Sequence, residues 1–113
     1  MVDVIAATDA DSDEPAPGIR AAQLAHGDRL HAQHVELSPG AGDDGDPHSH
    51  PHEQLTYVLA GTPIMTIDGE DHAVSAGDSL VIPGDVPHMA RNEADEAAVL
   101  LDVFTPPRSD LLE

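Results

Sequence analysis

Proline and glycine punctuate this chain so often that no long regular element fits between them. The 113 residues include 10 Pro and 9 Gly. Many stand in turn-forming pairs between short apolar runs, such as Pro17-Gly18, Gly27-Asp28, Pro39-Gly40, Asp68-Gly69, Gly77-Asp78 and Pro83-Gly84. Short apolar segments between closely spaced turns are typical of β-sandwiches and barrels. No helix-length pattern with a 3.6-residue period appears after residue 18. The spacing therefore predicts an all-β fold.

The apolar runs place the expected strands at 19–25, 29–37, 46–50, 54–60, 63–67, 71–75, 79–82, 87–92 and 97–104. Asp68-Gly69 between two of these runs is a strong signal for a tight hairpin. An additional edge strand is expected at 1–5. Residues 8–16 are acidic and contain proline, so we expect a loose linker there. The predicted organisation is an N-terminal segment, 1–17, followed by one β domain, 18–113.

The last predicted strand has apolar residues on both faces. One set of alternating residues is Val99, Leu101 and Val103, and the other is Leu100, Asp102 and Phe104. A strand that is apolar on both faces is usually covered on both. The core of a chain with only two aromatic residues, Tyr57 and Phe104, is modest. We therefore expect one sheet face to pack against a second subunit, which makes the protein a homodimer.

The charge of the chain excludes several classes of partner. There are 22 acidic residues and 4 basic ones, all arginine, and the formal net charge is −18. No basic stripe exists to neutralise nucleic-acid phosphates or to bind an anionic membrane. A strongly acidic chain without lysine or cysteine looks like a protein from an extreme halophile, and the alternative is an ordinary acidic protein. In molar salt the Debye length is about 3 Å, so self-repulsion is screened.

The chain offers no signal for export or membrane insertion. The first 14 residues contain neither a basic region nor an apolar stretch. The longest apolar run, Ala97–Leu101, is far too short to cross a bilayer. We therefore expect a cytoplasmic protein. The absence of cysteine removes disulfides, thiolate metal sites and cysteine nucleophiles together.

Histidines are concentrated at one place in the sequence. Of 8 in the chain, His48, His50 and His52 lie within five residues of one another. Histidines two apart on a strand point to the same face, so His48 and His50 can bind one metal ion. Gln54 at the start of the next strand offers a side-chain oxygen, and His88 supplies a fourth ligand. Glu53 is the competing ligand, but its parity places it on the opposite face from Gln54.

The remaining histidines have less specific interpretations. We expect His52 in the loop or behind the ligands. The others, His26, His31, His34 and His72, are expected at the surface or the rim of the barrel.

The spacing of these residues resembles the two motifs of the cupin family. The first motif reads G(X)5HXH(X)3–4E(X)6G, and this chain has Gly42, His48, His50, Gln54 and Gly61 in those places. The second reads G(X)5PXG(X)2H(X)3N, and this chain has Gly77, Pro83, Asp85, His88 and Asn92. The resemblance implies a jelly-roll-like double-stranded β-barrel with a divalent metal held by His48, His50, Gln54 and His88.

Two departures from the motifs bear on the chemistry. Gln54 stands where the general pattern has glutamate, which makes the ligand set neutral. The ion then keeps its full positive charge, which favours a Lewis-acid role toward an anionic substrate. Asp85 stands where the pattern has glycine, and Asp tolerates the left-handed turn conformation better than most residues.

The segment from Asp102 to Arg108 is similar to the C-terminal motif of small cupins of the pectin-degradation type. Those enzymes convert 4,5-unsaturated monouronates into the linear keto form. The resemblance implies that Asp102 transfers a proton, that Phe104 forms an apolar wall over a sugar and that Arg108 binds a carboxylate. The alternatives from the residues alone are that Asp102 bonds backbone at the rim, that Phe104 is plain core and that Arg108 pairs with a surface carboxylate.

The residues and the resemblance are therefore compatible with three functions. The first is a metal-dependent enzyme that ketonises unsaturated uronates, with a sugar carboxylate as its small-molecule partner. The second is a dioxygenase that uses the same metal site, and the third is a non-catalytic module that binds a sugar or small ligand. Imidazole and amide ligands suit Ni, Zn, Mn, Fe, Co or Cu, so the ligand set does not name the metal.

Overall fold

The computed structural model describes residues 2–43 and 45–112, which form strands and one short helix. In chain order these are β1 (Ser12–Ala16), β2 (Ile19–His26), β3 (His31–Leu37), β4 (Glu53–Ala60), β5 (Ile64–Ile67), β6 (Glu70–Ala73), β7 (Ser79–Ile82), β8 (His88–Arg91), β9 (Ala98–Thr105) and α1 (Ser109–Leu112). The fold is all-β, as the turn spacing predicts.

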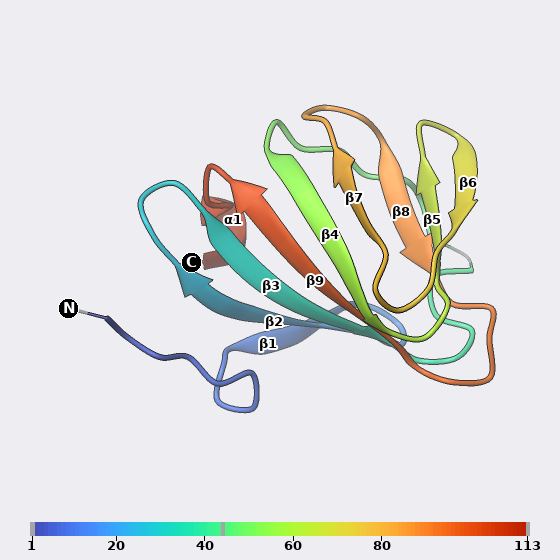
Figure 1. Ribbon diagram of the computed structural model, residues 1–113, viewed down its shortest axis with the longest axis horizontal. Coiled ribbons are helices and arrows are strands. Elements are labelled where there is room, and N and C mark those ends of the chain that lie inside the picture. The colour runs from blue at the N-terminus through green and yellow to red at the C-terminus, as the bar shows by residue number, and fades with distance from the viewer. Residues whose placement is uncertain (1, 44, 113) are drawn as a thin grey trace.

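The strands form two antiparallel sheets (Figure 1). The larger has the order β1-β2-β3-β9-β4-β7, and the smaller has the order β6-β5-β8. Strand β9, the last in the chain, is inserted between β3 and β4 and pairs with both. The C-terminal segment therefore lies in the middle of the larger sheet, and its Phe104 lies beside His50 of the histidine loop.

Period-two alternation determines which side chains enter the barrel. In β4 and β9 every second residue is buried. Asp102 and Phe104 share the inward face of β9, as their parity predicts. The core is almost entirely aliphatic, and it is built from residues of both sheets, including Leu37, Val58, Met65, Ile82 and Leu100.

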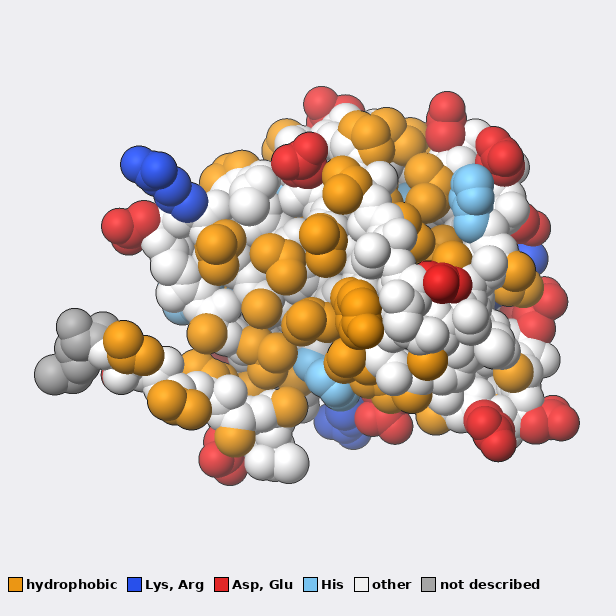
Figure 2. Space-filling view, viewed as in Figure 1, with side chains coloured by type: hydrophobic (Ala, Val, Ile, Leu, Met, Phe, Trp, Pro, Cys, Tyr) orange, Lys and Arg blue, Asp and Glu red, His pale blue; other side chains and the backbone are white. Residues whose placement is uncertain are grey.

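The outward face of the larger sheet is unusually apolar. Leu55, Tyr57 and Leu59 of β4 and Val81 of β7 are exposed large hydrophobic residues. Figure 2 shows hydrophobic side chains gathered over the middle of the visible face, with acidic side chains mainly around its edge. A neutral apolar face on an acidic chain suits a subunit contact, and the homodimer stays a prediction.

The two-residue hairpin is confirmed. Ile67 pairs with Glu70 across Asp68-Gly69, and both turn residues have positive φ, 51° and 80°. This is the left-handed backbone that tight hairpins need and that Asp and Gly tolerate.

Two expectations from the sequence are wrong. The N-terminal strand is β1 at Ser12–Ala16, inside the expected linker, while residues 2–5 lie outside any strand and residue 1 lies outside the described part of the chain. Exposed acidic residues and Pro15 concealed β1, because an edge strand with one free side needs no apolar alternation. Residues 46–50 form only an isolated bridge at His48, since Pro47 and Pro51 cannot donate to a ladder. The helix α1 is a single turn of four residues, which is too short to show a 3.6-residue period in the sequence.

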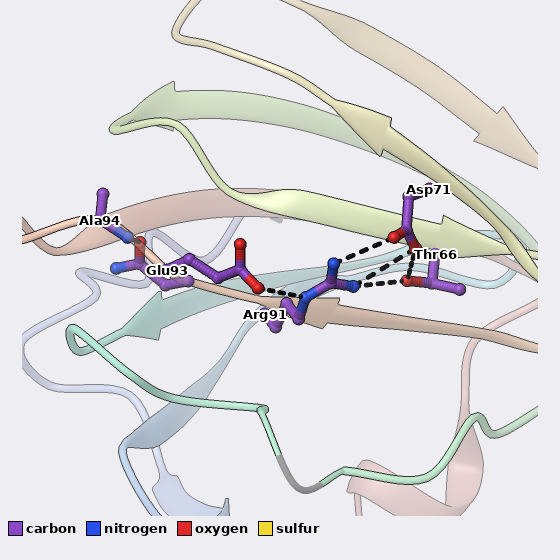
Figure 3. A network of polar contacts seen from close by, with 6 residues as sticks. Thr66, Asp71, Arg91, Glu93 and Ala94 are labelled. Carbon is purple, nitrogen blue, oxygen red and sulfur yellow. Dashed lines mark hydrogen bonds and ion pairs between the residues drawn. The ribbon is translucent and has the colours of Figure 1, made fainter.

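A polar network fastens the smaller sheet together on its exposed side (Figure 3). The Arg91 guanidinium on β8 donates to the Asp71 carboxylate on β6 at 3.0 Å and to the Thr66 hydroxyl on β5 at 3.0 Å. It also donates to Glu93 at 3.1 Å. One arginine thus links all three strands.

Among the helices of the described residues, none is long and apolar enough to cross a membrane.

Candidate functional site

The loop that carries His48 and His50 is held by backbone hydrogen bonds from the second motif. His48 and His88 exchange both bonds, N to O at 2.9 and 2.8 Å. The Asp85 amide donates to the His50 carbonyl at 2.7 Å, and Asp85 has φ of 68°. The left-handed conformation that we expected at Asp85 is confirmed. This local backbone therefore brings two segments 40 residues apart into one cluster.

Three imidazole rings and one amide lie together at the end of the barrel. The ring centroids are 4.4 Å apart for His48 and His88, 5.0 Å for His50 and His88 and 6.3 Å for His48 and His50. The Gln54 Oε1 atom lies 3.1 Å from His50 Nε2. We call His48, His50, Gln54 and His88 the histidine cluster.

Backbone carbonyls orient two of the rings. His88 Nδ1 donates to the Val86 carbonyl at 2.9 Å, and His50 Nδ1 donates to the His52 carbonyl at 3.1 Å. Each Nε2 of the neutral ring is left as a lone pair, which is the arrangement that a metal ligand requires. His88 Nε2 is buried and has no hydrogen-bond partner among the described residues.

The electrostatics of the cluster keep the rings neutral. Burial lowers the pKa of His50 and of His88, and the nearby Arg108 charge lowers both further. His48 is more exposed, and partial desolvation beside the His88 ring lowers its pKa too. Neutral imidazole is the form that binds a metal, because a proton occupies the same lone pair.

The donor set fits a divalent transition-metal ion. The orphaned Nε2 of His88, the similarly oriented His50 ring and the Gln54 oxygen all belong to the same cluster. Within residues 2–43 and 45–112, no group of three His, Asp or Glu side chains lies in an arrangement that could hold a metal ion.

A cavity of about 610 Å³ extends from the cluster into the barrel. Its lining includes His48, Gln54 and His88 together with Asp102, Phe104 and Arg108. The structure therefore places the three residues of the C-terminal segment on the same cavity as the cluster. The remaining lining is largely apolar and comes from strands of both sheets, from the loop before His48 and from α1, and it includes the acidic residues Asp13, Asp43 and Asp46.

Asp102 is the buried acid of this cavity. It is 6% exposed and accepts hydrogen bonds from the Thr56 hydroxyl at 2.7 Å and from Gln33 Nε2 at 3.1 Å. Burial raises the pKa of Asp102, and the hydrogen bonds from Thr56 and Gln33 oppose that rise. Its partners are side chains of neighbouring strands, and not backbone at the rim.

Phe104 and Arg108 form one wall of the cavity. The Phe104 ring contacts the His50 ring at 5.6 Å between centroids, and the Arg108 guanidinium carbon lies 5.2 Å from the Phe104 centroid. A guanidinium over an aromatic face is attracted by the ring quadrupole. Arg108 also pairs with Asp110 at 2.8 Å, while its Nε is buried without a partner among the described residues.

The alternation in β4 separates the two competing ligands. Gln54 is buried and Glu53 is exposed on the other face. Of the histidines expected at the surface or rim, His26 and His72 are exposed and His34 is half-buried. The expectation for His31 is wrong, because it is fully buried against Phe104 at 5.3 Å between rings.

Sequence reasoning missed a set of linked polar residues that leads to Asp102, namely the buried Thr56, Gln33 and His31 and the half-buried Gln23. Gln33 pairs with Asp102 across β3 and β9, and Asp102 pairs with Thr56 across β9 and β4. Each has the inward parity of its strand. The signal was present as polar residues at core positions, but it is visible only once the order β3-β9-β4 is known.

Comparisons with known proteins agree with this fold. The Cupin_2 family, described as a cupin domain, matches residues 33–104, which include the whole histidine cluster. The pectin degradation protein KdgF of Dickeya dadantii is 33% identical over 101 residues, covering 88% of this chain and 89% of that protein.

Solved structures share the fold over nearly the full length. KdgF from Halomonas sp. is 30% identical with a TM-score of 0.85, covering 98% of this chain and 99% of that one. An RmlC-like cupin from Shewanella frigidimarina is 27% identical with a TM-score of 0.83, covering 98% and 96%. The barrel, the two motifs and these matches together show that this protein belongs to the Cupin_2 family of cupin domains.

Proposed function

We propose that this cupin is a metal-dependent enzyme that acts on a small sugar acid and ketonises 4,5-unsaturated uronates. The observation that carries the proposal is the shared cavity, where Asp102, Phe104 and Arg108 line the same space as the histidine cluster. The similarity to a pectin degradation protein over 88% of the chain supports the same substrate class.

In this proposal the cluster and Arg108 provide the positive side of the cavity. His48, His50, Gln54 and His88 would hold the ion, which supplies Lewis-acid polarisation of substrate oxygens when bound. Arg108 binds the uronate carboxylate. Its stacking on Phe104 and its ion pair with Asp110 restrict the guanidinium before substrate arrives. A planar guanidinium suits a carboxylate because it donates two parallel hydrogen bonds.

Asp102 is the proton-transfer group of the proposed reaction. Ring opening breaks the bond between the anomeric carbon and the ring oxygen, and the anomeric hydroxyl loses its proton as the aldehyde forms. The ring oxygen is left as an enolate at C5, which becomes a ketone when C4 takes up the proton that the anomeric hydroxyl lost. The reaction is an isomerisation and needs no oxidant. Asp102 is the buried carboxyl on the cavity that can move a proton between these positions.

The net charge of −18 opposes the approach of an anionic substrate. Screening limits that opposition, because in molar salt the Debye length is about 3 Å and the long-range repulsion between exposed charges is damped. Inside the cavity, attraction between the substrate carboxylate and the nearby positive groups then governs binding. The assay should therefore be run in high salt.

The test follows the absorbance of a 4,5-unsaturated uronate, with and without a chelator. We expect the absorbance to fall on adding the metal-replete protein and to persist once the metal is removed. Persistent absorbance with metal-replete protein would contradict the proposal. Oxygen consumption with a small organic substrate would then indicate the dioxygenase, and substrate binding without turnover would indicate the binding module.

The Asp102→Asn variant tests the acid directly. Asparagine keeps an oxygen for the Thr56 hydroxyl but cannot exchange a proton. We expect kcat to fall by about 10²–10⁴-fold, the usual contribution of a positioned acid or base, with metal content unchanged. Asp71→Asn makes the same chemical change on the exposed side of the smaller sheet and should retain activity. Full activity of Asp102→Asn would remove Asp102 from the mechanism.

A further inference from the structure

A line of buried and half-buried hydrogen bonds crosses the inner face of the larger sheet and ends at the histidine cluster. Its side-chain contacts, in order, are His31 to Gln23 at 2.7 Å, Gln23 to Gln33 at 2.8 Å, Gln33 to Asp102 at 3.1 Å, Asp102 to Thr56 at 2.7 Å and Thr56 to Gln54 at 2.9 Å. Each of these groups can bond in a limited number of ways, so the line has a definable direction.

The direction is fixed first at the far end. The Arg108 backbone amide can only donate, and it donates to His31 Nδ1 at 3.3 Å. The neutral His31 ring must then carry its proton on Nε2 and donate to Gln23 Oε1. The Gln23 amide therefore presents its NH₂ to Gln33 Oε1, and Gln33 presents its NH₂ to Asp102. Every bond on this side runs toward the carboxylate.

Thr56 transmits this direction to the cluster. Asp102 accepts with both oxygens, so the single hydroxyl proton of Thr56 is committed to Asp102 Oδ1. The Thr56 oxygen then offers Gln54 only lone pairs, and only the NH₂ end of the Gln54 amide can bond to it. The Gln54 carbonyl oxygen is left facing the Nε2 lone pair of the neutral His50 ring, and two acceptors that face one another suit a cation.

The alternative orientation of Gln54 would disable the cluster. If the amide turned over, the Gln54 carbonyl oxygen would face the Thr56 hydroxyl oxygen, and both are acceptors. The Gln54 NH₂ would then point at the histidines. An amide NH₂ is a donor and offers no lone pair to a cation. Thr56 is 0% exposed, so its hydroxyl is not accessible to bulk water that could supply a substitute partner.

We propose that Thr56 is a positioning residue, which sets the Gln54 side chain with its oxygen toward the histidine cluster through a hydrogen bond that Asp102 polarises. The inference rests on one part of the proposed function, namely that the histidine cluster binds a metal ion. It assigns to Thr56 no contact with substrate.

The test compares Thr56→Val, which removes the hydroxyl at nearly constant volume, with Thr56→Ser, which keeps it. Nickel binding to the metal-free proteins is measured by calorimetry, without substrate. We expect Thr56→Val to weaken nickel affinity by about 10-fold or more, the usual effect of losing a partner that orients a ligand. Thr56→Ser should bind nickel like the wild type. Thr66→Val deletes a strand hydroxyl outside the site and should also bind normally.

The orientation can also be measured in the wild-type protein, in case Thr56→Val fails to fold. In NMR spectra of the metal-free chain, we expect the Gln54 side-chain NH₂ protons to show contacts to Thr56 and none to the His50 ring. Contacts to the His50 ring, or unchanged nickel affinity in folded Thr56→Val, would overturn the inference. A wild-type protein that binds no nickel or other divalent metal would instead contradict the proposed function, and the NMR result would still test the orientation.

Discussion

At the scale of single residues, the position of the histidine loop depends on close backbone approach at Gly42. This glycine has φ of 84°, and a Cβ atom there would lie 2.4 Å from the Ala90 carbonyl oxygen and 2.9 Å from Arg91 Cα. Both neighbours are backbone atoms of β8, the strand that begins with His88. The loop that leads to His48 therefore crosses β8 at a distance that only glycine permits.

Gly42→Ala should destabilise the protein more than Gly69→Ala. Both glycines have positive φ, 84° and 80°, but a Cβ at Gly69 meets nothing within 4 Å. Gly69→Ala incurs only the left-handed strain of roughly 1–2 kcal/mol, whereas Gly42→Ala adds a clash with backbone. Urea unfolding of both variants measures the difference in free energy of unfolding. Equal losses would show that the approach at Gly42 is not a constraint.

The sequence predicts single residues well where a backbone conformation demands a residue type. Asp85 takes the left-handed conformation expected of it, and Gly42 lies where the first motif needs its opening glycine. Residues whose role depends on a neighbouring strand were not predictable. Thr56 looks like an ordinary strand residue until Asp102 is known to lie opposite it.

At the scale of elements, the short strands of the smaller sheet are joined by charge as well as by backbone. The Arg91 guanidinium holds the pKa of Asp71 at about 2, below its ordinary value, through direct hydrogen bonds that the Thr66 hydroxyl supplements. Because the carboxyl is exposed, the contribution to stability is small. Its sign is nevertheless defined, since a lowered pKa favours folding only while the carboxylate is ionised.

Asp71→Asn should therefore alter the acid limb of the stability curve. Above the unfolded-state pKa of about 4 the wild type should melt at a higher temperature than the variant. The gap should shrink as the pH falls from about 4 toward 2, where Asp71 becomes protonated in the folded state as well. Melting curves at a series of pH values measure the gap. A constant difference down to pH 2 would be inconsistent with this ion pair.

Strands and turns differ in how well the sequence predicts them. The hairpin at Asp68-Gly69 is specified by local chemistry and was predicted, whereas β1 and the bridge at His48 depend on partners distant in sequence. β1 forms because β2 presents a free edge to it. The order β3-β9-β4, which assembles the site, carries no local signal at all.

At the scale of the whole molecule, charge governs the conditions under which the fold persists. With 22 acidic residues against 4 basic ones, most carboxylates have no cation to pair with. Mutual repulsion of surface carboxylates destabilises the compact state in dilute buffer. The apolar outer face of β4 and β7 is the complement of this acidic surface, and it is where the predicted second subunit would pack.

Stability should consequently increase with salt. At molar KCl the Debye length is about 3 Å, which removes most of the repulsion between surface charges. We expect the melting temperature to rise substantially between dilute buffer and molar KCl. Thermal unfolding followed by circular dichroism measures this directly, and a melting temperature independent of salt would exclude adaptation of this chain to high salt.

The most direct test of the account is a crystal structure of the protein loaded with a divalent metal. We predict one ion at the end of the barrel, bound by Nε2 of His50 and His88, by a ring nitrogen of His48 and by Gln54 Oε1. The metal–ligand distances should be about 2.0–2.2 Å. An ion bound elsewhere, or one bound to His48 and His50 with His88 beyond coordination distance, would contradict the account.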